Sequence, residues 1–196
     1  MKTTIRPLLK SAGLLLGCLA LTAPAAGGTE PTAFALIEEG NRHVGEDAKG
    51  RVVQIRSDKS VGTLTPNIWH VVFYDPDASA KATEVKFAAG KKVDVKRPPR
   101  ILELLSKASA ELPLEKLKID SDRAIEIATA EPVLKHLTLT ATRLELGRWE
   151  GVPVWKVRLW AQKLRRPNQS ADIGEVFLSA EDGEVLRNRL NPGKVD

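Results

Sequence analysis

The sequence predicts an α+β fold of two tandem units, each a helix on a curved antiparallel sheet, with a linker helix between the units. The clearest sign is the alternation over residues 152–160, where apolar and cationic side chains fall on opposite sides of an extended backbone. The inward set is Trp155, Val157 and Leu159, and the outward set is Lys156, Arg158 and Trp160. Two further observations are Asp182-Gly183, which favours a tight hairpin turn, and a first half that repeats this order of elements.

The repeat aligns two aromatic strands, residues 69–74 with 155–160, and two Glu-Val pairs, 84–85 with 175–176. The distance from tryptophan to glutamate is 15 residues in the first half and 20 in the second. A surface loop absorbs such a difference at little cost in chain entropy. The alternative to a repeat is a chance alignment of two α+β segments.

In the first half, helical spacing over residues 31–44 predicts a short amphipathic helix. Alternating or continuous apolar patterns predict strands over residues 51–56, 67–74 and 83–88. Residues 91–96 add a lysine-rich strand of the kind found at sheet edges. The second strand must end at 75–77, because this Asp-Pro-Asp sequence favours a turn.

Arg97-Pro98-Pro99-Arg100 marks a boundary, and the apolar spacing from Ile101 to Leu112 predicts the linker helix. Asp120 or Ser121 then caps a second helix, which Pro132 interrupts. Strands follow over residues 137–150, from 152 onward and over 174–178. The predicted division of the chain is a signal peptide 1–26, an N-terminal unit 27–97, a linker 98–118, a C-terminal unit 119–190 and a departing tail 191–196.

The first 26 residues have the order of a secretory signal peptide: three basic residues, an apolar run and a small-residue end at 23–26. The apolar run is shorter than a membrane-spanning helix requires. Removing this segment lowers the formal net charge from +5 to +2, because it holds three basic residues and no acidic one. We therefore expect a periplasmic or secreted protein, and no nucleic acid among its partners.

Cys18 is the single cysteine, and it lies within the predicted signal peptide. The sequence Leu15-Leu16-Gly17-Cys18 is similar to a lipidation signal, in which the cysteine carries the lipid and the protein becomes anchored to the envelope. The alternative is that Cys18 is discarded with the peptide. In both cases the remaining chain has no disulfide and no cysteine chemistry.

The second half resembles the PepSY family, which takes its name from propeptides of secreted peptidases. The residues that match are 119–128 for the helix, 151–157 for the strand and 174–185 for the last hairpin. Ser179 departs from the aspartate that is common in the family, and the loop 162–173 is long and basic. The first half matches only in outline. The resemblance implies a non-catalytic binding or inhibitory module of cystatin-like αβββ shape in each unit.

No residue pattern indicates catalysis, a cofactor or a metal. The three histidines, His43, His70 and His136, lie on different predicted elements without the paired spacing of metal ligands. The Asp-Xaa-Asp sequences at 75–77 and 120–122 lack the twelve-residue loop of a calcium site, so turn and cap roles explain them better. Nucleophile-elbow and phosphate-loop sequences are also missing.

The candidate binding surface consists of Trp149, Lys156, Arg158 and Trp160. Cationic side chains beside tryptophan can bind an extended peptide, a sugar or a nucleic acid strand. Lys163, Arg165 and Arg166 extend this surface into the following loop. The alternative is that Trp160 packs into the interior, with lysine and arginine stems covering it.

The leading hypothesis is an exported, non-catalytic protein that binds a protein or peptide in the cell envelope, such as a protease that it restrains. The competing hypothesis is an enzyme or small-ligand carrier with a pocket between helix and sheet. A third is a structural adaptor anchored through Cys18. The sequence does not indicate the oligomeric state.

Overall fold

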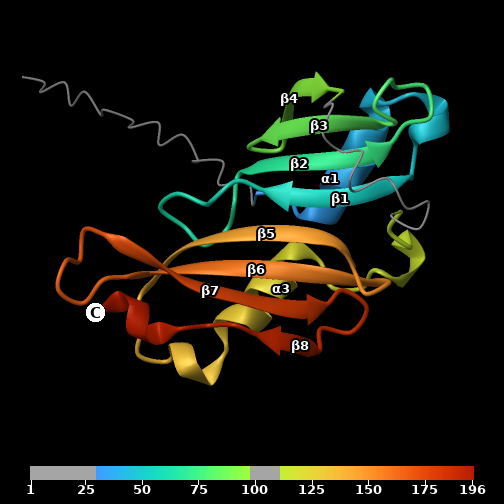
Figure 1. Ribbon diagram of the computed structural model, residues 1–196. Helices are drawn as coiled ribbons and strands as arrows, with labels where there is room; N and C mark the ends of the chain where they lie inside the picture. Colours follow the sequence, from blue (N-terminus) through green and yellow to red (C-terminus); the bar gives the residue numbers. More distant parts are fainter. Residues whose placement is uncertain (1–29, 98–110) are drawn as a thin grey trace, which may run out of the picture.

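The computed structural model describes residues 30–97 and 111–196 (Figure 1). The predicted signal peptide, the lipidation candidate Cys18 and the body of the linker helix predicted from Ile101 lie outside the described residues. The alternating segments all form strands close to their predicted positions. The β7 strand begins earlier than predicted, at Ser170.

The described residues form eight strands, two α-helices and five short 3₁₀ turns. The strands are β1 Val52–Ser57, β2 Ile68–Tyr74, β3 Ala82–Ala88, β4 Lys91–Lys96, β5 Leu139–Trp149, β6 Val152–Gln162, β7 Ser170–Ser179 and β8 Val185–Asn188. The helices are α1 Ala33–Gly40 and α3 Ser121–Thr129. The 3₁₀ turns are Asn41–His43, Glu46–Ala48, Leu114–Lys116, Pro132–Leu134 and Pro192–Val195.

The predicted division of the fold into two tandem helix-plus-sheet units is wrong. All eight strands form one antiparallel sheet in the order β4-β3-β2-β1-β5-β6-β7-β8 (Figure 1). β1 pairs directly with β5, with Ile55 opposite Leu146 and Arg56 opposite Glu145. The physical reason is that β1 and β5 would each be an unpaired sheet edge in separate units, and pairing satisfies their backbone groups.

Buried hydroxyl groups extend the contact between β1 and β5 beyond these two residue pairs. Ser60 N donates to Thr142 O at 2.8 Å, and Thr142 N donates to Ser60 Oγ at 2.8 Å. Leu144 N donates to Ser57 Oγ at 2.9 Å, while Thr142 Oγ1 donates to Leu64 O at 2.6 Å. We call this set of contacts the seam. Each bond satisfies a group that would otherwise be buried without a partner.

The N-termini of the two helices also meet across the chain. Asp120 is the N-cap of α3 and accepts from Ser121 N, which confirms the predicted capping role. The same two side chains also cap α1: Ala33 N donates to Ser121 Oγ at 3.0 Å and Phe34 N donates to Asp120 Oδ1 at 3.2 Å. Free amide groups of both helices are therefore satisfied by one pair of residues.

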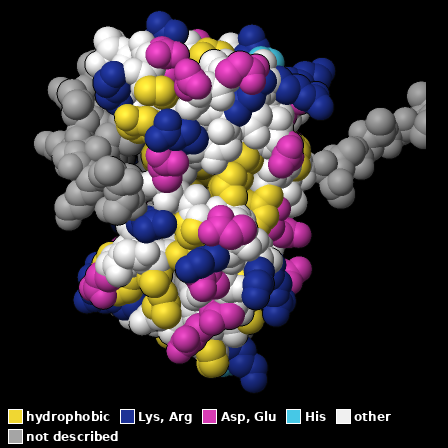
Figure 2. All heavy atoms as spheres, turned by 90° about the vertical axis from the view of Figure 1, so that its right-hand side faces the viewer, with side chains coloured by type: hydrophobic (Ala, Val, Ile, Leu, Met, Phe, Trp, Pro, Cys, Tyr) yellow, Lys and Arg dark blue, Asp and Glu magenta, His cyan; other side chains and the backbone are white. Residues whose placement is uncertain are grey.

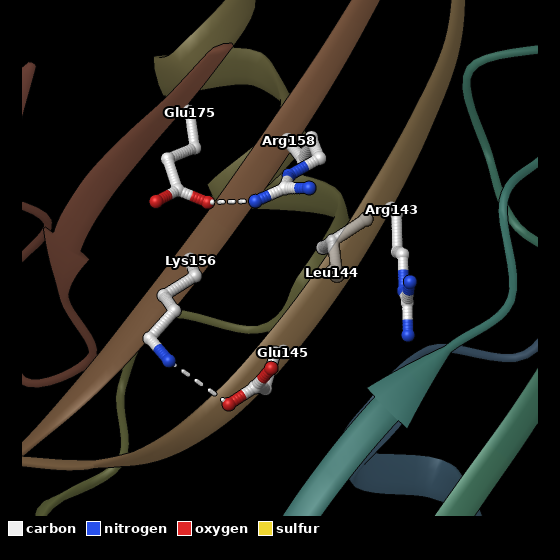
Figure 3. A pocket seen from close by; sticks show the side chains of 6 residues that line it. All are labelled: Arg143, Leu144, Glu145, Lys156, Arg158 and Glu175. Atoms are coloured by element: carbon white, nitrogen blue, oxygen red, sulfur yellow. Dashed lines mark hydrogen bonds and ion pairs between the residues drawn. The ribbon is translucent and has the colours of Figure 1, made fainter. Parts of the chain in front are cut away.

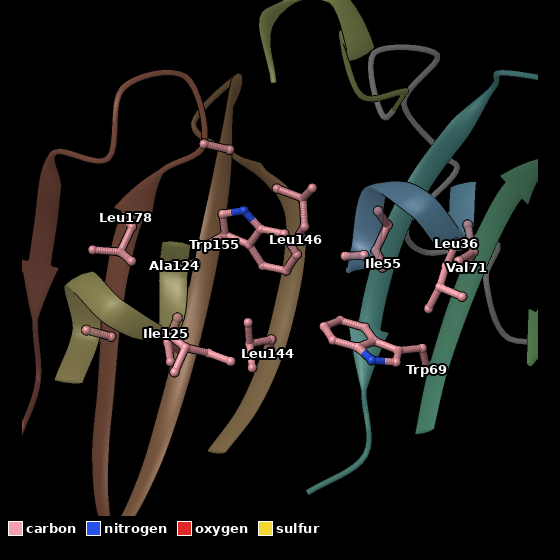
Figure 4. Close-up of a cluster of buried hydrophobic side chains, with 14 of the residues drawn as sticks. Leu36, Ile55, Trp69, Val71, Ala124, Ile125, Leu144, Leu146, Trp155 and Leu178 are labelled. Carbon is pink, nitrogen blue, oxygen red and sulfur yellow. The ribbon is translucent and has the colours of Figure 1, made fainter. Parts of the chain in front are cut away.

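One hydrophobic core lies between the helices and the sheet (Figure 4). Trp69 and Trp155, the two aligned tryptophans, are 2% and 0% exposed, and each donates its indole N–H to a backbone carbonyl. Ile55 and Leu146 face each other within the same cluster. Because this shared core faces both α1 and α3, the helices cover one face of the sheet.

The structure confirms the predicted turn after β2 and contradicts the prediction made for the C-terminal tail. Asp75 ends β2 as predicted, since its Oδ1 accepts from the backbone N–H groups of Asp77 and Ala78. The C-terminal residues do not leave the domain as expected. Val195 is 2% exposed and its carbonyl accepts from Leu164 N at 2.8 Å.

Gly174 provides a test of the packing between β7 and the segment after β8. Its φ is +110°, and a Cβ there would lie 2.2 Å from the backbone oxygen of Arg189. We expect Gly174→Ala to lower the free energy of unfolding by roughly 2–4 kcal/mol in urea denaturation, because both the backbone and its neighbour must shift.

Gly147→Ala is the matched control, because a Cβ at Gly147 in β5 would meet no atom within 4 Å. We expect that variant to change the free energy of unfolding by less than about 1 kcal/mol. Equal effects of the two substitutions would contradict this description of β7.

Candidate functional site

Because the helices cover one face of the sheet, the outward side chains of β5–β8 line the opposite face. We call this surface the open face. The strand register aligns one row of it, in which Glu145 of β5 lies opposite Lys156, Lys156 opposite Phe177, and Phe177 opposite Arg187 of β8. The row therefore combines two cationic groups, one carboxylate and one aromatic ring.

The open face is hollowed near its middle. A shallow pocket of about 350 Å³ is lined by Glu145, Trp149, Lys156, Arg158, Glu175, Phe177 and Arg189. A smaller hollow of about 150 Å³ adjoins it and includes Arg143 (Figure 3). Three strands and the segment after β8 supply these side chains, so the pocket depends on the pairing of β5, β6 and β7.

Ion pairs hold the charged side chains of the pocket in place. Lys156 Nζ lies 3.1 Å from Glu145 Oε1, and Arg158 Nη2 lies 2.9 Å from Glu175 Oε2 (Figure 3). Arg189 Nη1 lies 3.8 Å from the other carboxylate oxygen of Glu175. The hydrogen bond to Glu175 raises the pKa of Arg158, so its guanidinium keeps a full positive charge. The cations are thus ordered before any ligand arrives.

Aromatic rings form the apolar part of the pocket. The rings of Trp149 and Phe177 have centroids 5.3 Å apart and are inclined by 46°. The Arg189 guanidinium carbon lies 5.3 Å from the centroid of the Phe177 ring, within the range of a cation–π contact. Phe177 is only 4% exposed, whereas Trp149 is half-buried at the end of β5. Trp149 therefore presents the accessible aromatic surface.

The structure brings together three of the four predicted binding residues: Trp149, Lys156 and Arg158 line one pocket. Trp160 does not line it. Its ring lies under the ammonium group of Lys59, 4.5 Å from the nitrogen.

The basic loop residues form a different hollow. Lys163, Arg165 and Arg166 line a space of about 270 Å³ together with Asp196. They therefore do not extend the pocket as predicted from the sequence.

Sequence reasoning missed Glu145, Glu175, Phe177 and Arg189. The alternation of side chains along a strand could have identified the first three. Along β5, Glu145 lies on the same face as the predicted site residue Trp149, and along β7, Glu175 and Phe177 share one face. Arg189 follows a strand of four residues whose pairing with β7 contains a register shift. Its position could not have been read from alternation alone.

A second charged cluster lies on β1–β3. His70 Nδ1 lies 2.8 Å from Glu84 Oε1, and His70 Nε2 lies 3.3 Å from Asp58 Oδ1. Arg56 also donates to Glu84. His70 and Glu84 are 8% and 7% exposed, so these two side chains are largely closed to a ligand, whereas the Asp58 side chain is 46% exposed.

Basic and acidic side chains are interleaved on the end of the molecule seen in Figure 2, and hydrophobic groups gather near the middle of that view. Neither sign of charge dominates this end of the molecule. Within residues 30–97 and 111–196, no three histidine or acidic side chains are grouped as metal ligands. No helix in these ranges is long and apolar enough to cross a membrane.

Comparisons of this chain with models of known protein families, with curated proteins and with solved structures found no match. The resemblance to the PepSY family stays a prediction from the sequence.

The buried cluster on β1–β3 predicts a pH dependence of stability. Burial would raise the pKa of Glu84, but the hydrogen bond with His70 and the charge of Arg56 outweigh burial and hold that pKa below its usual value. A lowered folded-state pKa stabilises the protein above the unfolded-state value of about 4.3, and this stabilisation is lost as pH falls through the folded-state pKa.

We expect Glu84→Gln to lower the free energy of unfolding at neutral pH and to flatten its decline below about pH 5, as measured by urea denaturation at a series of pH values. Glu46→Gln is the control, because the Glu46 side chain is 85% exposed. An unchanged pH dependence in Glu84→Gln would show that this carboxylate is not coupled to folding.

Proposed function

We propose that this protein is an exported, non-catalytic binding protein that engages a protein or peptide partner through the open face. The observation that supports this best is the pocket of Trp149, Lys156 and Arg158 on the side of the sheet that the two helices leave uncovered. A partner in the cell envelope, such as a protease that the protein restrains, fits the predicted export signal.

The chemistry of the open face supports a protein partner. Tryptophan and arginine are among the residues that contribute most to protein interfaces. The pairs of Arg158 with Glu175 and of Lys156 with Glu145 fix four long side chains in advance. Less side-chain entropy is then lost on binding.

The alternative of an enzyme or small-ligand carrier with a pocket between helix and sheet has less support. Trp155, Leu144 and Leu146 are fully buried there. The α-carbon of Gly40 in α1 packs so closely on Phe73 that an added Cβ would lie 2.8 Å from the ring. The hollows described above open instead on the outer surface.

Anchoring through Cys18 would place the same surface at a membrane. It would make the protein an envelope adaptor rather than a diffusing inhibitor. Mass spectrometry of the mature N-terminus distinguishes a lipidated Cys18 from a chain that begins near Gly27.

The proposal predicts position-dependent cross-linking. Val152 lies at the start of β6 opposite Trp149, and Val133 lies in the turn after α3; they are 46% and 43% exposed. We expect a photoreactive residue at position 152 to form a covalent adduct of one defined mass in envelope extracts, because it borders the pocket.

The same residue at position 133 is the matched control, and we expect it to form no such adduct. Adducts of equal yield from both positions, or an adduct from position 133 alone, would contradict binding through the open face.

A further inference from the structure

Positive charge exceeds negative charge on the open face. Its cations are Arg143, Lys156, Arg158, Arg187 and Arg189, and its anions are Glu145, Asp172 and Glu175. Each of the three carboxylates lies within 4 Å of a cation. Among the residues that the structure describes, Arg143 and Arg187 form no ion pair, and both are exposed.

Arg143 has an unfavourable position within the sheet. It lies directly opposite Arg158 in the pairing of β5 with β6. Like charges in directly opposite positions destabilise a sheet. Glu175 compensates Arg158, whereas the Arg143 guanidinium is turned away from Arg158 (Figure 3). A ligand that supplies an anionic group near Arg143 would relieve this repulsion.

We propose that the open face recognises an acidic segment of its protein partner, with carboxylates of that segment at Arg143 and Arg187 and an apolar side chain against Trp149. This inference rests on the proposed function and specifies its partner. Arginine suits such a role, because its planar guanidinium can bind a carboxylate through two parallel hydrogen bonds.

The fixed carboxylates of the open face favour a protein segment over a nucleic acid. Glu175 of β7 lies between the two arginines in the strand order, Glu145 lies on the same strand as Arg143, and both glutamates line the pocket. A phosphate backbone, with a charge on every nucleotide, would approach both of them. An acidic segment can place apolar side chains there, since residues two positions apart in an extended chain point to the same side and need not both be acidic.

The test uses a short fluorescein-labelled peptide in which pairs of glutamates alternate with pairs of valines, so that each side of the extended chain carries both residue types. Its binding to the whole protein is measured by fluorescence anisotropy. We expect saturable binding that weakens as salt is added. We expect Arg143→Gln to weaken binding by about threefold to fivefold, and the double variant with Arg187→Gln by about tenfold.

Arg148→Gln is the matched control. Arg148 lies on the same strand and is exposed, but its side chain projects from the opposite face, so we expect unchanged affinity. Circular dichroism verifies that all variants fold. Equal losses in Arg143→Gln and Arg148→Gln would overturn the inference, because they would indicate attraction by overall charge.

Two further probes complete the experiment. The same peptide with lysine in place of each glutamate should not bind, and single-stranded oligothymidylate should bind more weakly than the glutamate peptide. Tighter binding of either probe would overturn the inference. If the glutamate peptide does not bind but the photoreactive residue at position 152 still forms its adduct, the proposed acidic specificity is overturned and the proposed function is left intact.

Discussion

The pairing of β1 with β5 is the constraint on which the rest of the structure depends. Only Ile55 and Arg56 of β1 lie in register with β5, so a short contact joins two four-stranded halves. The hydroxyl groups of Ser57, Ser60 and Thr142 strengthen it by satisfying buried backbone groups. Each such hydrogen bond contributes about 1 kcal/mol to the free energy of unfolding, and a buried backbone group left without its partner would lower that free energy by more. The seam makes the two halves one sheet.

This continuity determines which surfaces the protein presents. In this single sheet both helices lie over the main core on the same side, and the other side of β5–β8 faces outward. Strands β5 and β6, which lie on one side of the seam, supply Trp149, Lys156 and Arg158. The arrangement of these side chains therefore follows from the register of β5, β6 and β7. The proposed binding role therefore depends on a rigid sheet face rather than on loops.

Local chemistry could be predicted from the sequence, whereas distant pairing could not. Alternation correctly separates buried Trp155 from outward Lys156, and the helix cap, Asp120, is one of the two residues predicted for that role. The β1–β5 pairing joins residues such as Ser60 and Thr142, 82 positions apart, and no periodic pattern encodes it. Trp160 was grouped with the pocket because strand alternation gives the face of a side chain but not its neighbours.

Amide hydrogen exchange at the seam is the most direct test of a single continuous sheet. The amide of Leu144 donates to Ser57 and that of Thr142 donates to Ser60, so both should exchange as slowly as amides in the middle of β2 and β6. Their exchange should then require global unfolding. Much faster exchange at these two amides than within either half would show that the halves separate, and would contradict this account of the fold and of the open face.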